Sequence, residues 1–514
     1  MRKIIIHPYL FALFPVLFLY AHNIDTIHIN EIFTPVLLSI LLAAFLVVIS
    51  YLFTKDYKKS ALISSLSIVL FFSYGHIYQL IQGGKLSNFI IGRHRYLLPL
   101  WALILIFSIY LIVRTKRQLK TITIFSNITS IILISISLIN IGYYEFKSNS
   151  NKYDISKNSP TQINIEISYK PDTLPDIYYI ILDGYARRDI LKDIYDYDNS
   201  DFINWLTEKG FYVAERSNSN YNQTLLSLAS SLNINFIQDI ITTIPSSDDR
   251  SILIELIANN KLFEFLRKHN YRIIAFSSGY SGTEIESADI YKHCWALSEF
   301  HTMLINTTPL SAIKTTLFPT LYDIHRQRIL YTFNELTKIN TQKSPVFVFA
   351  HMLIPHPPFV FNKNGDKVDA KIPYTISDGS HLLKFINKEQ YIEGYRNQII
   401  FMNKNLEYTV EKILSKNHNT IIILQADHGP GSHLDWENPK NTYMNERMTI
   451  LNAYYLPNGG DKLLYDSISP VNTFRVILNY YFGANLELLE DRSYFSCWNT
   501  PYNFIDVTDE VKSK

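Results

Sequence analysis

Cysteine and an excess of charge of either sign are what this sequence most clearly lacks. Only two of its 514 residues are cysteines, Cys294 and Cys497. Two thiols exclude a disulfide framework and a zinc site built of thiolates, and leave one disulfide between them as an open alternative. The 48 basic residues are nearly balanced by 46 acidic ones, so the net charge is +2. This balance argues against nucleic-acid binding, which usually needs a basic excess.

Long apolar runs are confined to the N-terminal part of the chain. Five of them are long enough to cross a bilayer: Ile4–Ala21, Phe33–Phe53, Ala61–Ile81, Tyr96–Val113 and Ile122–Tyr143. A signal peptide is the alternative for the first run. No small-residue cleavage site follows that run, and further spans come after it, so we interpret it as a retained helix.

The loops between these runs predict the orientation of the chain in the membrane. Basic residues lie at the N-terminus and in the loops after the second and fourth runs (Arg2, Lys3, Lys55, Lys58, Lys59, Arg114, Lys116, Arg117, Lys120). The loop after the first run has none, and the loop after the third has Lys85, Arg93 and Arg95. Because the more basic side is usually cytoplasmic, five spans place everything after Tyr143 outside the cytoplasmic membrane. If one span were miscounted, the part of the chain after Tyr143 would lie on the cytoplasmic side.

The chain is too long for one compact core, and its composition predicts three parts. Residues 1–146 form a helical transmembrane domain. Residues 147–172 are rich in Asn, Ser and Lys and are typical of a polar linker. Residues 173–514 have the pattern of a soluble domain, which we expect outside the membrane.

The soluble part alternates short apolar strands with helical stretches. The strands are expected in "DIYYIILD", "YRIIAFSS", "PVFVFAH", "TIIILQAD" and "ILNAYYLP", with helical periodicity between them, as in "ILIELIANNKLFEFLRKHN". Continuous apolar strands that alternate with helices predict an α/β domain with a mostly parallel sheet.

Ionisable side chains recur where these strands end. Asp183, His351, Asp427 and His428 all occupy such positions. Ligands of an open α/β sheet bind outside the carboxyl ends of its strands. A single aspartate there is often only a turn residue. The recurrence at three strands favours a shared divalent metal ion, because carboxylates and imidazoles are ligands that suit zinc or manganese.

Thr224 is the candidate nucleophile. It follows a polar stretch and precedes a helical run, in "SNSNYNQTLLSLASSLN". It is therefore expected at the N-cap of a helix, and one interpretation is that it only caps that helix. In the other interpretation, helix amides and a metal lower the pKa of its hydroxyl and make it a nucleophile. Spacing alone does not separate the two.

Four motifs together resemble the alkaline phosphatase superfamily: "ILDGY", "NYNQTLLSLAS", "HMLIPHPPF" and "ADHGPGSH". The likeness is strongest to its membrane-anchored branch of lipoteichoic acid synthases, phosphoethanolamine transferases and phosphoglycerol transferases. It implies a helical transmembrane bundle of about five spans, followed by an extracytoplasmic α/β alkaline-phosphatase-like catalytic domain.

The resemblance also implies roles for residues. Asp183, Thr224, Asp427 and His428 would hold one divalent ion, zinc or manganese, with Thr224 as the nucleophile. His351, His356 and His433 would lie nearby to bind the substrate phosphate, protonate the leaving group or hold a second metal. Asp183 stands where the transferases often have glutamate. No Cys-x-Pro-x-Arg-like motif of the sulfatases surrounds Thr224, which makes sulfate-ester hydrolysis unexpected.

Arg475 and Asn472 are further candidates for substrate binding. Both lie in "SPVNTFRVILNYYF" just before an apolar helical run. An arginine can clamp a phosphate with two hydrogen bonds. The alternative is that Arg475 is an ordinary salt-bridge partner.

These observations predict a metal-dependent phosphotransferase of the bacterial cytoplasmic membrane. It would move a phospholipid headgroup phosphate onto an envelope glycan or lipid acceptor through a phospho-threonine intermediate. A phosphodiesterase that passes the group to water is the alternative enzyme, and a non-catalytic envelope protein is the alternative from another class.

Overall fold

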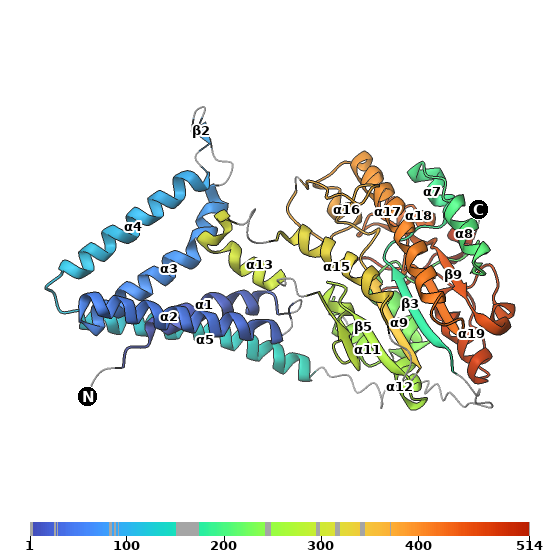
Figure 1. The fold of residues 1–514 in the computed structure, drawn as a ribbon, viewed down its shortest axis with the longest axis horizontal. Helices are drawn as coiled ribbons and strands as arrows, with labels where there is room; N and C mark the ends of the chain where they lie inside the picture. Colours follow the sequence, from blue (N-terminus) through green and yellow to red (C-terminus); the bar gives the residue numbers. More distant parts are fainter. Residues whose placement is uncertain are drawn as a thin grey trace. The chain divides into compact units, whose positions relative to one another are not determined.

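The computed structural model describes residues 4–24, 27, 29–81, 85–86, 89–90, 92–150, 174–241, 248–294, 299–313, 319–339, 345–370 and 372–512. The chain forms two compact units (Figure 1). The first unit comprises Met1–Asn151 and Ala296–Ile324, and the second comprises Lys152–Trp295 and His325–Lys514.

The first unit is a bundle of long apolar helices. It contains α1 (His7–His22), η1 (Ile29–Ile32), α2 (Phe33–Thr54), α3 (Tyr57–Ile81), α4 (His94–Arg114) and α5 (Lys120–Ser150), with a two-stranded hairpin of β1 (Lys85–Leu86) and β2 (Phe89–Ile90). In the described part of the chain, four helices, α2 to α5, are long and apolar enough to cross a membrane. Four of the five predicted spans are therefore confirmed as helices of spanning length.

The first predicted span forms a shorter helix. α1 has 16 residues and has Pro8 in its first turn, a position where proline favours a helix start. At 1.5 Å per residue its length is about 24 Å, below the ~30 Å of a hydrocarbon core. α1 packs against α2, α3 and α5, so it is an internal helix of the bundle.

The predicted domain boundaries differ from the structure in one segment. Helix α13 (Glu299–Asn306) and the 3-10 helix η3 (Pro309–Ile313) belong to the first unit, although we placed residues 173–514 in one domain. The difference has a physical reason, because apolar side chains of α13 are buried among the bundle helices. The predicted linker begins inside α5, which extends to Ser150, and the rest of it lies outside the described residues.

A seven-stranded sheet forms the centre of the second unit. Its order is β4-β9-β8-β3-β7-β5-β6. β3 (Asp176–Leu182) pairs in parallel with β7 (Val346–Met352) and β8 (Thr420–Gln425), and β7 pairs in parallel with β5 (Arg272–Phe276). β5 pairs in parallel with β6 (Ile290–Lys292). β9 (Asn452–Tyr455) and β4 (Tyr212–Val213) complete one edge in antiparallel pairs, so the predicted mostly parallel sheet is confirmed.

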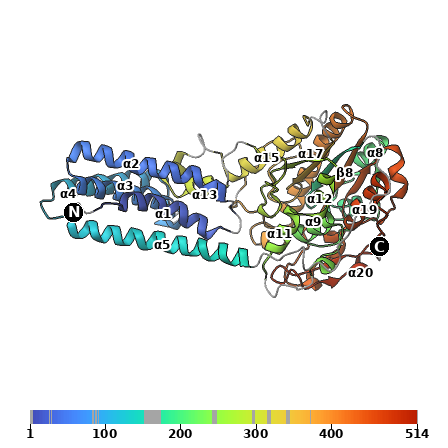
Figure 2. The same cartoon turned by 90° about the horizontal axis from the view of Figure 1, so that it is seen from below.

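Helices cover both faces of this sheet, as the buried strands require. Ile177, Tyr179 and Ile181 of β3 belong to a core shared with α9 (Thr224–Asn233), α11 (Ser251–Ala258), α12 (Lys261–Lys268) and α19 (Pro470–Phe482). α15 (Leu321–Leu336) and α17 (Lys388–Leu414) lie on the other side in Figure 2. The remaining elements of the second unit are short: α7 (Arg188–Tyr195), α8 (Ser200–Glu208), α10 (Ile237–Ile240), η2 (Ser281–Thr283), α16 (Gly379–Leu382), η4 (Pro439–Asn441), α18 (Met444–Met448), η5 (Pro457–Leu463), β10 (Tyr494–Phe495), β11 (Ile505–Asp506) and α20 (Thr508–Lys512).

The register of the central strands positions the candidate site. Ile181 of β3 is paired with His351 of β7 on one side and with Gln425 of β8 on the other. Asp183 and Asp427 each follow the last residue of their strand by one or two positions. Three neighbouring strands therefore deliver ionisable groups to one edge of the sheet, as predicted.

Candidate metal centre and catalytic group

Asp183, Asp427 and His428 form a compact buried cluster. One ligand atom from each lies within 4.8 Å of the others. The Nε2 atom of His428 is 3.7 Å from Asp183 Oδ1 and 3.3 Å from Asp427 Oδ2. All three residues are at most 2% exposed. Within the described part of the chain, neither of these two carboxylate oxygens has a hydrogen-bond partner.

The chemistry of this cluster fits a divalent cation. Burying ionised carboxylate oxygens without donors is costly unless a counter-charge is present. The Nδ1 atom of His428 donates a hydrogen bond to the carbonyl oxygen of Gly429 at 2.9 Å, which leaves the lone pair of Nε2 directed at the carboxylates. Burial, and then the nearby Arg447 guanidinium, lower the pKa of His428, so its imidazole is neutral. Neutral imidazole with a fixed second nitrogen is a common metal ligand.

Thr224 lies beside His428 and begins α9. Its Oγ1 atom is 3.0 Å from His428 Nε2. The prediction that Thr224 is the N-cap is wrong by one residue, because Gln223 holds that position and no side chain caps the helix. The hydroxyl of Thr224 is thus directed at the cluster and does not cap α9. The side chain is half-buried, so a substrate can reach it.

His351 supports Asp183 from the neighbouring strand. Its Nε2 atom is 3.2 Å from Asp183 Oδ2, and its Nδ1 atom is 2.9 Å from Thr283 Oγ1. Burial alone would lower the pKa of His351, but the hydrogen bond and charge of Asp183 outweigh it and raise this pKa. In turn, burial alone would raise the pKa of Asp183, but the charge of His356 and the hydrogen bond from His351 outweigh it and hold this pKa well below its usual value. Both ring nitrogens of His351 are engaged, which suits a residue that orients Asp183.

His356 reaches the same group from the loop after β7. Its backbone N–H donates to the carbonyl oxygen of Asp183 at 3.0 Å. Its ring centroid lies 6.3 Å from that of His428. Its Nδ1 atom donates to the carbonyl oxygen of Pro357 at 2.5 Å, and its Nε2 atom lies 3.9 Å from Asp378 Oδ2. His356 is therefore close to the cluster, as predicted.

Arg447 and Asp378 form a buried ion pair next to these residues, which sequence reasoning missed. Nη1 of Arg447 donates to Asp378 Oδ2 at 2.8 Å and to the carbonyl oxygen of Gly429 at 2.9 Å. Nε of Arg447 donates to the carbonyl oxygen of Asn222 at 3.0 Å. Arg447 thus connects the loop before Thr224, the loop after His428 and the aspartate that faces His356. No motif in the sequence marks either residue.

His433 lies at the more open side of the loop that follows β8. Its Nδ1 atom is 3.0 Å from Glu446 Oε2, and its backbone N–H donates to the same oxygen at 2.8 Å. Its side chain is 34% exposed, whereas Glu446 is 1% exposed. The buried carboxylate therefore fixes one edge of an accessible imidazole. Sequence reasoning also missed Glu446.

Arg475, one of the two further candidates for substrate binding, does not join the cluster. Its guanidinium donates to the carbonyl oxygens of Ile234 and Glu487. Ile234 follows α9 at its C-terminal end, whereas Thr224 begins that helix. The side-chain amide of Asn472 is also engaged, with Tyr465, Leu489 and Asp491. Both residues serve the packing of α19 and are not brought to the cluster.

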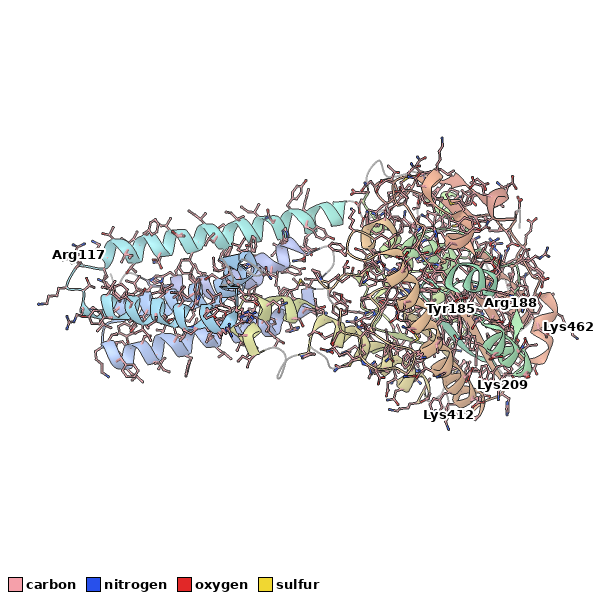
Figure 3. All side chains as sticks on the ribbon, turned by 90° about the horizontal axis from the view of Figure 1, so that it is seen from above. Arg117, Tyr185, Arg188, Lys209, Lys412 and Lys462 are labelled. Carbon is pink, nitrogen blue, oxygen red and sulfur yellow. The ribbon has the colours of Figure 1, made fainter. Side chains whose placement is uncertain are left out.

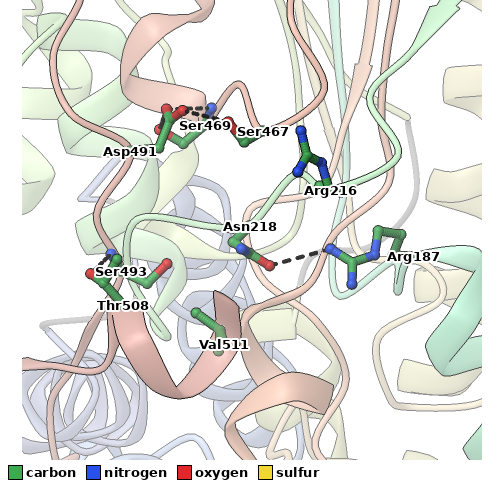
Figure 4. A pocket seen from close by; sticks show the side chains of 9 residues that line it. All are labelled: Arg187, Arg216, Asn218, Ser467, Ser469, Asp491, Ser493, Thr508 and Val511. Atoms are coloured by element: carbon green, nitrogen blue, oxygen red, sulfur yellow. Dashed lines mark hydrogen bonds between the residues drawn. The ribbon is translucent and has the colours of Figure 1, made fainter. Parts of the chain in front are cut away.

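A polar cavity of about 260 Å³ occurs in the second unit without any of the candidate residues (Figure 4). It is lined by Arg187, Arg216, Asn218, Ser467, Ser469, Asp491, Ser493, Thr508 and Val511. Its charged groups are largely used internally. For example, Arg187 binds Asp189 with two hydrogen bonds, and Asp491 Oδ1 accepts from the hydroxyl and N–H of Ser469. The polar groups of this cavity are therefore less available to a ligand than the two carboxylate oxygens of the Asp183, Asp427 and His428 cluster.

Comparison with solved structures gives distant similarities. The C-terminal periplasmic domain of EcEptC from Escherichia coli, in complex with zinc, has a TM-score of 0.44 and 10% identity, over 67% of this chain and 95% of that one. The integral membrane protein lipooligosaccharide phosphoethanolamine transferase A from Neisseria meningitidis has a TM-score of 0.40 and 12% identity, over 92% and 94% of the two chains. No curated protein matches the chain.

A family model gives a clear result. The model named Sulfatase matches residues 186–461, more than half of the chain. The match covers Thr224, His351, His356, Asp427, His428 and His433, and it begins three residues after Asp183. The predicted resemblance to the alkaline phosphatase superfamily is confirmed, and the chain belongs to the Sulfatase family.

Proposed function

We propose that this chain is a metal-dependent phosphotransferase in which Thr224 carries the transferred group. One observation carries the proposal. The hydroxyl of Thr224 lies 3.0 Å from His428 Nε2, beside two buried carboxylate oxygens that lack donors in the described part of the chain. A hydroxyl at a cation-binding cluster is the arrangement that an activated nucleophile requires.

Asp183, Thr224, Asp427 and His428 would hold the divalent ion, zinc or manganese. When bound, it supplies positive charge that favours the ionised hydroxyl and neutralises charge on the phosphoryl oxygens. His351 and Gly184 orient the two carboxylates, through Asp183 Oδ2 at 3.2 Å and Asp427 Oδ1 at 3.2 Å. These bonds leave the other oxygen of each carboxylate available to the ion.

The reaction would proceed in two displacements at phosphorus. In the first, the Thr224 hydroxyl gives its proton to a neighbouring imidazole and Oγ1 bonds to phosphorus, while the bond from phosphorus to the diacylglycerol oxygen breaks. The departing oxygen takes up a proton from an imidazole, for which His356 and the accessible His433 are the candidates. In the second, the acceptor hydroxyl loses its proton and bonds to phosphorus, the bond to Thr224 breaks, and Oγ1 of Thr224 takes up a proton again. The headgroup phosphate is thereby moved without net consumption of water.

Two features support a lipid donor and an envelope acceptor. The chain contains helices long and apolar enough to cross a membrane, which would keep the enzyme next to its donor. No Cys-x-Pro-x-Arg-like motif of the sulfatases surrounds Thr224, so we do not propose a sulfate ester as the substrate. The donor is a phospholipid headgroup, and the acceptor is a hydroxyl of an envelope glycan or lipid.

The experiment measures diacylglycerol release by the full-length protein in vesicles of mixed bacterial phospholipids. We expect release that depends on added acceptor glycan or lipid and on the divalent ion, and that is lost in Thr224→Ala. Fast release of free phosphorylated headgroup without an acceptor would replace the transferase with a phosphodiesterase. Full activity in Thr224→Ala would contradict both enzymes.

A further inference from the structure

The segment Glu299–Ile313 lies within the soluble part of the sequence but is built into the helical bundle. It comprises α13 and η3, between β6 and α15 of the chain. Figures 1 and 2 both show α13 among the helices of the first unit. The contacts agree, since α13 packs against α1 and η3 packs against α3. The chain thus leaves the first unit after residue 151, returns at residue 296 and leaves again after residue 324.

Apolar side chains of this segment complete the packing of the bundle. Phe300 is fully buried in a cluster with Val16, Tyr20, Ile27 and Ile32. Met303 and Leu304 pack against the same cluster. Leu304 also packs against a second cluster, made of Ala12, Ala43, Ile68 and Phe72. Without this segment, the facing sides of α1 and α3 would lose an apolar partner.

A glycine in α3 permits a close approach of the two backbones. The N–H of Gly75 donates to the carbonyl oxygen of Thr307 at 2.8 Å. A Cβ atom at Gly75 would lie 1.8 Å from the carbonyl oxygen of Asn306 and 2.7 Å from the Cα atom of Thr307. Gly75 is six residues before the end of α3, so the contact lies roughly 9 Å inside the helix end.

The composition of the segment suits a position inside the end of the bundle. It contains no lysine or arginine, and Glu299 at its first position is its one acidic residue. The hydroxyls of Thr307 and Thr308 donate to the carbonyl oxygens of Leu304 and Ile305, at 2.7 and 2.8 Å. Backbone outside a spanning helix is tolerated at membrane depth where protein surrounds it and its polar groups are satisfied.

The segment lies at the bundle end opposite to the basic loops. It contacts the C-terminal part of α1 and α3 and the N-terminal side of α2. The lysines of the α2–α3 loop and the basic residues of the α4–α5 loop are at the other ends of these helices. Figure 3 shows Arg117 of the second loop at the far end of the bundle. Because basic loops are usually cytoplasmic, this placement puts the segment at the extracytoplasmic end of the bundle.

We propose that Glu299–Ile313 is a re-entrant element that attaches the catalytic part of the chain to the bundle independently of residues 151–173. Its partners are α1, η1 and α3, and Gly75 of α3 is the point of closest backbone approach. A chain cut only between residues 151 and 173 would stay assembled as two fragments. This proposal is independent of the reaction that the enzyme catalyses.

The test uses the full-length protein with a specific protease site inserted between Lys157 and Asn158. After cleavage in native membranes, we expect nearly all of the C-terminal fragment to remain in the membrane pellet through salt and alkaline washes. Gly75→Leu should release most of this fragment, because its side chain occupies the place of Asn306 and Thr307. Gly142→Leu in α5 is the matched control, since no atom lies within 4 Å of a Cβ there, and it should retain the fragment.

A second variant acts on the other side of the contact. Phe300→Ala combined with Leu304→Ala removes the buried side chains of the segment and should also release the fragment. Release of the fragment from the cleaved parent chain would overturn the proposal. Retention in both Gly75→Leu and the double alanine variant would do the same. Binding of the fragment to protein-free vesicles of the same lipids would assign the attachment to the bilayer and also contradict it.

Discussion

At the scale of single residues, two carboxylate oxygens of the cluster, Asp183 Oδ1 and Asp427 Oδ2, are buried without a donor in the described part of the chain. Asp427 shows most directly what this implies. Its Oδ1 atom accepts from the N–H of Gly184 at 3.2 Å, while its Oδ2 atom faces His428 and has no donor in the described part of the chain. The Oδ1 atom therefore holds the loop at Gly184 in place, and the Oδ2 atom is available to a metal ion.

Asp427→Asn should lose the bound divalent ion and all turnover while the fold remains. An asparagine oxygen can still accept from Gly184, but the amide group carries no charge and places a donor at the cation site. Elemental analysis of the purified protein measures the ion, and the thermal unfolding midpoint reports on the fold. Asp176→Asn is the control, because Asp176 begins the neighbouring strand β3, at the opposite edge of the sheet, and accepts from Val346 and Asn417. Full metal occupancy in Asp427→Asn would refute the ligand assignment.

Arg447→Met should destabilise the second unit by roughly 3–5 kcal/mol, because it leaves the buried Asp378 carboxylate without its partner. The pair has side chains that are 2% exposed each and a separation of 2.8 Å. Replacing both residues by apolar ones should cost much less than the sum of the single changes. Chemical denaturation followed by tryptophan fluorescence measures the free energy of unfolding.

Arg188→Met provides the contrast for Arg447. Arg188 forms a 2.9 Å pair with Glu215 in which the two side chains are 46% and 40% exposed. Its replacement should change the free energy of unfolding by less than about 1 kcal/mol. A loss in Arg447→Met as small as that in Arg188→Met would show that Arg447 does not hold the loops around the site together.

At the scale of elements, the N-terminus of α9 separates catalysis from helix capping. Thr224 is the first residue of this helix and its side chain does not cap it. Thr224→Ala should therefore abolish turnover and change stability by less than the ~1 kcal/mol of a lost cap. Thr224→Ser should retain part of the activity, since it keeps the hydroxyl. Activity assays on the folded fraction, with metal content measured in parallel, check both variants. Equal activity of the alanine and serine variants would leave Thr224 without a catalytic role.

The sequence was most informative where strands end. Asp183, Asp427 and His428 follow continuous apolar runs, and parallel pairing necessarily brings such ends to one edge. It was least informative where a side chain's partner is remote in sequence. Arg447 and Asp378 are 69 residues apart, and no local pattern connects them. Likewise, only the fold shows that the donors of Arg475 are used by the carbonyl oxygens of Ile234 and Glu487.

The segment 299–313 shows a different limit. Its apolar residues occur at helical spacing, and the sequence alone does not distinguish a helix of the soluble core from one that packs in a membrane bundle. The segment is also shorter than a membrane span. The structure has one helical bundle and one α/β domain, and the sequence does not predict that this segment joins the bundle.

At the scale of the whole molecule, the orientation in the membrane decides which compartment the enzyme serves. A reporter that is active only after export should be active when fused after Lys152. A reporter that is active only in the cytoplasm should be active when fused after Lys116. The reason is the concentration of basic residues in the loops at one end of the bundle. The reverse pattern would mean that α1 does not cross the membrane and that the second unit is cytoplasmic.

The most direct test of the central claim is the intact mass of the full-length protein after exposure to mixed bacterial phospholipids without acceptor. We expect a covalent adduct with the mass of one phosphorylated headgroup, located on Thr224 by peptide fragmentation and absent from Thr224→Ala. Adding the acceptor should remove the adduct, whereas buffer alone should leave it in place, because a transferase must protect its intermediate from water. An unmodified Thr224 in a protein that turns over the same lipids would contradict the account.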